Sequence, residues 1–359
     1  MRKNIIYIFL MMVCIGCKDQ SITGSKPIRG TIIQVDSLFN GSYFYCMKDD
    51  YMIMRSYALD SLIYVAKVSG DSLLSQYSFL AKGQGPLEVN HFYTWTEDSI
   101  LTVIDYTSSL EKGFQIHYRS HELLQSDKWE KITFSPTVKE YFTSGSSRFT
   151  LLNDSIILFL GGRDGYPEIL SMYQLNTGNI FPVNYWPDDG FAGNNHLKQR
   201  VYMENSYLFK QKRQNKYLYH AGNGRVVMLF ELSDGKIRKQ HYIYNTFPQY
   251  ELRSDGLNYL VKYSDEKSLE SLDISVTEQY IYMMISPHNQ EKLFKGYPYY
   301  YGDKVVVFDW EGNWIKEFDT EIPFCSFVVD QNDEYLYSMG LDLDTGEDVI
   351  VRYKIDLYK

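Results

Sequence analysis

The chain has 359 residues, of which 44% are hydrophobic and 16% aromatic, and its formal net charge is −9. This apolar content suffices for a packed core, and 33 Tyr with 20 Phe favour strands over helices. The negative charge excludes a sequence-unspecific nucleic-acid binder, which needs a positively charged surface.

The N-terminus has the pattern of a targeting segment. Arg2 and Lys3 precede an apolar run from Ile5 to Ile15, which is too short to span a bilayer comfortably. Gly16 before Cys17 resembles a bacterial lipoprotein signal, although Cys14 stands where such signals usually carry an aliphatic residue. We therefore expect a signal peptide over residues 1–16 and lipidation of Cys17. An ordinary secretory signal that is cut elsewhere is the alternative.

Residues 17–30 are predicted to form a flexible tether, because Lys18 to Lys26 is polar and has no apolar period. The rest of the chain, residues 31–359, is assigned to one domain, because a repeat fills nearly all of it.

That repeat is a short polar or acidic step that leads into a strand rich in Tyr, Ile, Leu and Met. Its first apolar positions recur roughly every 50 to 60 residues, a period typical of propeller blades of about four strands. These positions are Tyr51, Ile100, Ile156, Tyr217, Tyr280 and Tyr335. The fold predicted is all-β, a six-bladed β-propeller of four-stranded antiparallel blades.

Hairpin turns support the same repeat. Asn176-Thr177-Gly178, Asp234-Gly235 and Glu311-Gly312-Asn313 are turn sequences that supply the positive φ that tight hairpins need. In the last unit the third strand, Val349 to Ile355, is followed only by Asp356 to Lys359. An open blade edge invites aggregation, so we expect Thr31 to Asp36 to complete the last blade and close the ring.

Two stretches exceed the minimal blade. Gln249 to Glu270 is charged and has leucines at helix-like spacing, which predicts a short helix or lid between the fourth and fifth blades. Ser286 to Asp303 is a long loop within the fifth blade, and it contains Tyr297, Tyr299, Tyr300 and Tyr301. These tyrosines are candidates for stacking on sugar rings or packing against a protein partner, with inter-blade packing as the alternative for at least half of them.

Two segments resemble a known family, the six-bladed TolB-like β-propeller lipoproteins of Gram-negative envelopes. One is the turn Gly83-Gln84-Gly85-Pro86-Leu87-Glu88, similar to that family's Gly-x-Gly-Pro-Gly-Glu turn, with Leu87 in place of a Gly. The other runs from Val305 to Asn313 and continues with Asp330 to Tyr337. The resemblance implies the fold and an envelope location, but no activity and no catalytic residue.

Three further motifs are more typical of structural roles than of binding sites. In the family-like turn, Gly83, Gly85, Pro86 and Glu88 are more typical of a structural turn than of an anion-binding loop, because no P-loop Lys-Ser/Thr follows. His117 and His121 lie in a segment that looks extended, so metal binding is not expected of them. The acidic run Asp342 to Asp348 is too short for an EF-hand and lies where the sixth blade needs a turn.

Cys46 and Cys325 remain after Cys14 and Cys17 are assigned to the signal and the anchor. Both lie on first strands of blades that would be neighbours in a closed ring. A disulfide between them and two buried free thiols both stay open.

The function expected from the sequence is that of a non-catalytic, lipid-anchored outer-membrane lipoprotein, exposed either to the periplasm or at the cell surface. We expect a monomer that binds an envelope protein or a glycan, with no cofactor, no metal and no nucleic acid. The alternative is a metal-dependent hydrolase or lactonase at the propeller axis, because such sites leave no local sequence motif.

Overall fold

A computed structural model describes residues 27–33, 42–56, 61–89, 92–97, 100–105, 113–117, 126–132, 149–153, 155–161, 168–191, 195–203, 206–211, 213–254, 259–263, 272–286, 296, 298 and 300–357. The predicted signal peptide, Cys17 and most of the predicted tether lie outside these residues, as do Tyr297, Tyr299 and His121. Among the described residues, no helix has the length and apolar character needed to cross a membrane.

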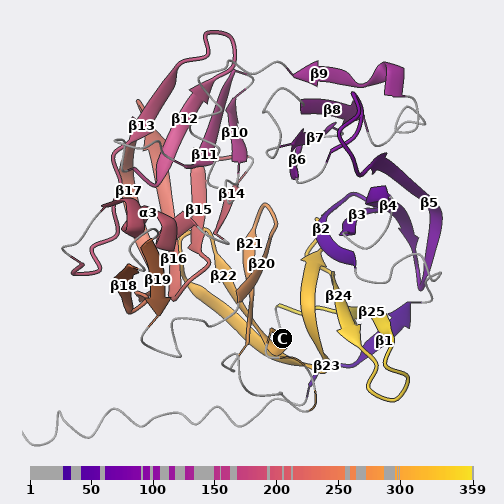
Figure 1. The fold of residues 1–359 in the computed structure, drawn as a ribbon. Coiled ribbons are helices and arrows are strands. Elements are labelled where there is room, and N and C mark those ends of the chain that lie inside the picture. The colour runs from indigo at the N-terminus through magenta and orange to yellow at the C-terminus, as the bar shows by residue number, and fades with distance from the viewer. Residues whose placement is uncertain are drawn as a thin grey trace, which may run out of the picture.

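The described strands form antiparallel blades arranged around a ring (Figure 1). The first four blades are separate four-stranded sheets. Blade 1 has β2 (Ser42–Lys48), β3 (Tyr51–Ser56), β4 (Ser61–Ser69) and β5 (Ser72–Ala81). Blade 2 has β6 (Phe92–Glu97), β7 (Ile100–Asp105), β8 (Gly113–His117) and β9 (Glu130–Ile132). Blade 3 has β10 (Phe149–Asn153), β11 (Ile156–Leu160), β12 (Leu170–Gln174) and β13 (Ile180–Val183). Blade 4 has β14 (Tyr207–Lys210), β15 (Lys216–Ala221), β16 (Arg225–Ser233) and β17 (Lys236–Thr246).

Blades 5 and 6 share one long strand and therefore form a single seven-stranded sheet. Its strands are β20 (Leu272–Val276), β21 (Tyr280–Ile285), β22 (Gly302–Asp309), β23 (Trp314–Val329), β24 (Tyr335–Leu341), β25 (Asp348–Lys354) and β1 (Gly30–Ile33). The first half of β23 pairs with β22 and its second half pairs with β24. β23 is thus the outer strand of blade 5 and the inner strand of blade 6. The prediction of an all-β, six-bladed propeller is confirmed.

The N-terminal strand lies at the edge of blade 6. β1 pairs antiparallel with β25, from Gly30 opposite Tyr353 to Ile33 opposite Ile350 (Figure 1). The strand proposed for this place from the sequence ran from Thr31 to Asp36, whereas β1 ends at Ile33. Just before β1, the backbone N–H of Ile28 donates to the carbonyl oxygen of Asp319 at 2.8 Å, which joins the start of the domain to β23.

Packing between blades explains which strands are most apolar. The second strands β7 and β15 are buried along nearly their whole length, because both of their faces meet a neighbouring blade. The outer strand β17 is largely exposed. Hydrophobic clusters join neighbouring blades, for example Met52 and Tyr64 of blade 1 with Val328 and Met339 of blade 6.

The predicted turns are present. Asp234 and Gly235 both have positive φ, 52° and 70°, as a two-residue hairpin turn of the primed type requires. Gly178 and Gly312 also adopt positive φ, 72° and 86°.

The helix predicted within Gln249 to Glu270 is wrong for the described part of this stretch, which does lie between blades 4 and 5 as expected. Within the described part of this stretch, β18 (Tyr250–Ser254) and β19 (Tyr259–Tyr263) form a two-stranded antiparallel hairpin. A helix that the sequence did not predict, α3 (Asn195–Met203), lies instead between blades 3 and 4. Figure 1 shows α3 beside β18 and β19.

The strand order gives the ring two distinct ends. Each blade has four antiparallel strands, so the chain leaves a blade at the same end of the ring at which it entered. The connections between blades and the turns between the second and third strands therefore lie at that end. We call this end the loop face. It carries the Gly83–Glu88 turn, the described residues between β13 and β14 with α3, the β18–β19 hairpin and Tyr300. The opposite end, the turn face, carries the short hairpins, such as Asp234-Gly235.

Candidate functional site

The most elaborate polar cluster among the described residues lies at the loop face and is centred on Asp189. Oδ1 of Asp189 accepts hydrogen bonds from Nζ of Lys198 at 2.6 Å and from the backbone N–H of Phe191 at 3.0 Å. Oδ2 accepts from the hydroxyl groups of Tyr202 at 2.9 Å and Tyr250 at 3.0 Å. The Asp189 carboxylate lies in the connection that follows blade 3. It therefore links this connection to α3 and to the β18–β19 hairpin. We call α3 and this hairpin the cap.

Lys198 is held on several sides. Its Nζ also donates to the carbonyl oxygen of Pro187 and lies 5.7 Å from the centre of the Trp186 ring. The side chains of Lys198 and Asp189 are only 10% and 1% exposed, so this ion pair is shielded from solvent.

The C-terminal end of α3 is fixed by side chains from blade 4 and the segment just before it. The carbonyl oxygen of Tyr202 accepts from the hydroxyl groups of Ser206 at 2.8 Å and Tyr219 at 2.5 Å. The carbonyl oxygen of Val201 accepts from Nδ2 of Asn223 at 3.0 Å. These donors satisfy the carbonyl groups that every helix end leaves free.

Apolar packing secures the same region. Val201, Tyr202 and Met203 are buried in one cluster with residues of blades 3 and 4, and Tyr250 and Val261 of the hairpin pack against that cluster. The cap is therefore packed against the hydrophobic core between blades 3 and 4.

The environment shifts the pKa values of the acids in the cluster. Burial by itself would raise the pKa of Asp189, but the hydrogen bonds from Lys198, Phe191, Tyr202 and Tyr250 outweigh it and hold this pKa below its ordinary value. Burial and the nearby Asp189 carboxylate raise the pKa values of Tyr202 and Tyr250. Asp189 is thus an ionised acceptor between neutral tyrosines, an arrangement suited to holding the cap in place.

The tyrosine loop named in the sequence divides between core and surface. Tyr301 is 5% exposed, and its carbonyl oxygen accepts from the hydroxyl group of Ser286 at 3.0 Å. Tyr300 is 38% exposed, and its ring lies 5.2 Å from the ring of Tyr301. Of the two tyrosines described, one packs inside the propeller and one faces solvent.

The family-like turn places its Glu side chain against its glycines. The backbone N–H of Gly85 donates to Oε2 of Glu88 at 2.8 Å. A methyl group at Gly83 would lie 2.0 Å from the same oxygen. Glu88 therefore fills the space beside Gly83 and Gly85, while Pro86 lies within the turn.

The acidic run forms the turn between β24 and β25. Oδ1 of Asp342 accepts from the backbone N–H groups of Asp344 at 2.8 Å and Thr345 at 3.4 Å. The described residues contain no group of three or more His, Cys, Asp or Glu side chains placed to hold a metal ion.

The two cysteines are both free thiols in the structure, so the disulfide alternative is not formed. Sγ of Cys325 lies 3.6 Å from the carbonyl oxygen of Met339. Burial raises the pKa of the Cys325 thiol to about 12, which keeps it protonated and unreactive at neutral pH.

Sequence reasoning missed one buried histidine. His220 on β15 is 2% exposed, its ring stacks on Tyr207 at 5.8 Å, and within the described structure neither ring nitrogen has a hydrogen-bond partner. Burial lowers the pKa of His220 to about 3. His117 lies on β8, as the extended pattern predicted, and its side chain is outside the described residues.

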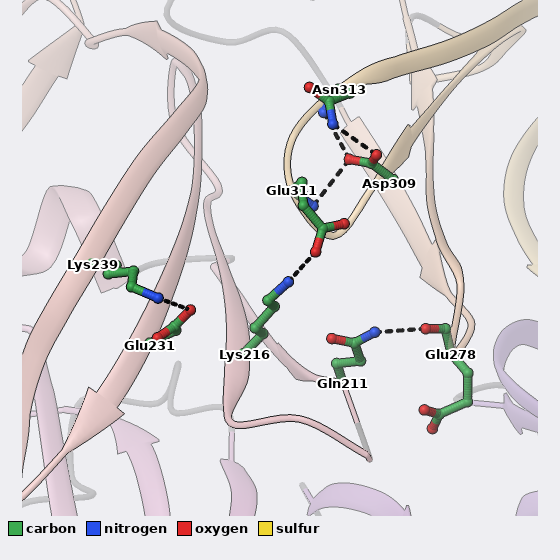
Figure 2. A network of polar contacts seen from close by, with 8 residues as sticks. All are labelled: Gln211, Lys216, Glu231, Lys239, Glu278, Asp309, Glu311 and Asn313. Atoms are coloured by element: carbon green, nitrogen blue, oxygen red, sulfur yellow. Dashed lines mark hydrogen bonds and ion pairs between the residues drawn. The ribbon is translucent and has the colours of Figure 1, made fainter.

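At the turn face, polar contacts join blades 4 and 5 (Figure 2). Nζ of Lys216 forms an ion pair with Glu311, and Nε2 of Gln211 donates to the carbonyl oxygen of Glu278 at 2.7 Å. Asp309 orders the turn that presents Glu311, since its Oδ1 accepts from the backbone N–H groups of Glu311 at 3.0 Å and Asn313 at 2.8 Å. This network braces two blades against each other.

Comparisons with known proteins agree with the fold. A family model described as TolB-like 6-blade propeller-like matches residues 174–332. A solved member of the DUF4221 family from Bacteroides vulgatus superposes with a TM-score of 0.53 at 12% identity, over 90% of this chain and 95% of that chain. A protein from Bacteroides fragilis that is named as exported superposes with a TM-score of 0.51 at 12% identity, over 92% of this chain and 95% of that chain. A search of curated proteins found no match.

At this level of identity the solved structures bear on the fold alone. The family match covers the region from the end of blade 3 to the first turn of blade 6, which includes Val305 to Asn313 but only the beginning of Asp330 to Tyr337. The resemblance seen in the sequence is therefore confirmed: the chain has a six-bladed β-propeller fold, and its residues 174–332 match the TolB-like six-bladed propeller family.

Proposed function

We propose that the protein is a non-catalytic, lipid-anchored β-propeller of the bacterial envelope that binds a protein or glycan partner through its loop face. The observation that carries this proposal is that the connections at one end of the ring are longer and more structured than those at the other end. Among the described residues, the cap, Tyr300 and Tyr301 are at the loop face, whereas the turn face carries mainly short hairpins, with the 3-10 helix Ser126–Lys128 before β9 as the exception. Long connections on a rigid scaffold are where binding residues concentrate.

The chemistry of the cap supports a binding role over catalysis. All four hydrogen bonds to Asp189 come from the protein itself, and Lys198 is bonded to Asp189 and Pro187. These charged groups hold the cap in one position. A fixed cap presents its outer surface without the entropy cost of ordering it on binding.

The anchor in this proposal is a lipid on Cys17, for which the apolar run and Gly16 before the cysteine are the support. The nine residues from Lys18 to Lys26 would then link the lipid to Pro27. A fully extended segment of this length reaches about 30 Å, enough to keep the ring beside the bilayer while it turns.

Site-specific photo-crosslinking in intact cells tests the binding role. A photoreactive residue placed at Tyr300 on the loop face is compared with one at Thr177, which is exposed at the turn face. We expect a discrete crosslinked species from position 300 and none from position 177. Equal crosslinking from both positions, or none from position 300, would contradict the proposal.

A further inference from the structure

The loops of blades 5 and 6 come close together at the loop face, and each exposes one large apolar or aromatic side chain. Tyr300 is 38% exposed and Leu343 is 50% exposed. The two loops touch, because a methyl group on Gly296 would lie 3.5 Å from Cδ1 of Leu343. Asp344 and Glu347, on the same turn as Leu343, are exposed. We call Tyr300, Leu343, Asp344 and Glu347 the Tyr300–Leu343 patch.

Backbone hydrogen bonds anchor the loops on both sides of this patch. Tyr300 is next to the buried Tyr301, whose carbonyl oxygen is bonded to Ser286. Leu343 lies in a turn closed by the backbone N–H of Gly346, which donates to the carbonyl oxygen of Asp342 at 2.7 Å. The carboxylate of Asp342 accepts two further backbone N–H groups. Backbone segments anchored in this way lose little freedom when a partner covers them.

The charges of the patch are one-sided. Among the described residues, neither Asp344 nor Glu347 has an ion-pair partner, and the carboxylate of Asp342 is occupied within the turn. Two exposed carboxylates beside an aliphatic and an aromatic group favour a ligand with cationic side chains next to an apolar one. Tyr300 adds a ring face that attracts Lys or Arg. The negative charge of the whole chain would draw the same ligand in from a distance.

We propose that the Tyr300–Leu343 patch docks a basic peptide segment that carries apolar residues, presented by a protein partner. This inference rests on the proposed function and specifies the partner's chemistry. A neutral glycan is the competing occupant, and it would bind without regard to salt or to the two carboxylates.

The test uses the full chain in detergent and three fluorescent peptides, with alternating Lys and Leu, Glu and Leu, or Lys and Ser. Binding is followed by fluorescence anisotropy at low and high salt. We expect the Lys–Leu peptide to bind best, and its affinity to fall as salt rises. D344N/E347Q should weaken it by about three- to tenfold, because each rim charge contributes modestly. L343S should also weaken binding but leave the salt dependence in place.

The matched control is D50N/D234N, which removes two exposed carboxylates at the turn face. It should leave affinity unchanged, and circular dichroism checks that every variant is folded. The inference is overturned if no peptide binds, if the Glu–Leu peptide binds equally well, or if D344N/E347Q acts no more strongly than the control. Crosslinking from position 300 in cells would then still stand, so failure of this inference is distinguishable from failure of the proposed function.

Discussion

The hydroxyl group of Tyr250 donates a hydrogen bond of 3.0 Å to Oδ2 of Asp189, although 61 residues separate the two along the chain. Tyr250 begins the hairpin between blades 4 and 5, and Asp189 follows blade 3. A single hydroxyl group therefore ties two inter-blade connections together.

Tyr250→Phe should loosen the hairpin without unfolding the propeller. The change removes one hydrogen bond, worth about 1 kcal/mol, while Tyr202 keeps Oδ2 of Asp189 bonded. Hydrogen exchange in residues 250–263 should accelerate by about fivefold, as expected from that free energy. The control is Tyr282→Phe, which removes a similar Tyr–Asp bond, 2.8 Å to Asp333, far from the cap. Unchanged exchange in the Tyr250→Phe hairpin would contradict the role given to this bond.

Asp189→Asn should be far more costly, because it leaves the buried Lys198 ammonium without its counter-charge. Removing one partner of a buried pair destabilises by about 3 to 5 kcal/mol. Denaturant unfolding at pH 7 measures the loss. Asp234→Asn breaks an exposed pair with Arg238 and should cost less than about 1 kcal/mol. Similar losses in the free energy of unfolding for the two variants would show that burial does not make the Asp189–Lys198 pair more important for stability than the exposed pair.

The same pair predicts a pH dependence. The pKa of Asp189 is lowered in the folded protein, so its stabilisation is complete above the ordinary Asp pKa and is lost as the pH falls through the lower, folded value. The stability difference between the native protein and Asp189→Asn should therefore stay constant from pH 7 to about pH 4 and shrink below it. A difference that declines between pH 7 and pH 5 would point to another group.

His220 predicts an acid sensitivity in a different range. Burial lowers its pKa to about 3, whereas an unfolded histidine titrates near its ordinary value of about 6.5. Between these values the unfolded chain binds a proton that the folded protein does not, so stability falls as the pH drops below about 6.5, by up to ~1.4 kcal/mol per pH unit.

His220→Leu should remove this part of the pH dependence, and thermal unfolding between pH 7 and pH 4 measures it. His241→Gln, at an exposed position on β17, is the control and should keep the native slope. Identical slopes for the native protein and His220→Leu would show that His220 is not the group that titrates.

Gly83 and Glu88 should be energetically coupled. A methyl group at Gly83 would meet Oε2 of Glu88 at 2.0 Å and displace it from the N–H of Gly85. We expect Gly83→Ala to cost about 1 to 2 kcal/mol in the native background. In a Glu88→Ala background the clash is absent, so the same substitution should cost much less. A double-mutant cycle by denaturant unfolding should therefore give a coupling of about 1 kcal/mol, and additive effects would contradict the geometry.

The repeat could be predicted from the sequence because the pattern of each blade is formed by residues that are close together along the chain. A buried second strand such as β15 begins at a polar step, and turns such as Asp234-Gly235 follow from residues that tolerate positive φ. The hairpin at Tyr250 was mistaken for a helix, because Leu252, Leu257 and Leu260 have spacings that suit either structure.

The Asp189 cluster could not be predicted in the same way. Its members Asp189, Lys198, Tyr202 and Tyr250 lie on different connections, and no local motif joins them. They meet because the ring brings those connections to one face. In α3 the apolar residues that are buried, Val201, Tyr202 and Met203, are consecutive, so the described apolar positions do not show the period by which a sequence reveals a helix.

The predicted membrane anchor depends on a single residue, Cys17. Cys17→Ala should release the protein from membranes, because the apolar run from Ile5 to Ile15 is too short to span a bilayer comfortably and the lipid would be the remaining attachment. Cell fractionation and metabolic labelling with a fatty-acid analogue measure the two consequences separately. Cys14→Ala is the matched control, since it changes the neighbouring signal cysteine and should leave both labelling and membrane association intact. Membrane retention of Cys17→Ala without label would place the attachment elsewhere in the chain, and labelling of that variant would assign the lipid to another residue.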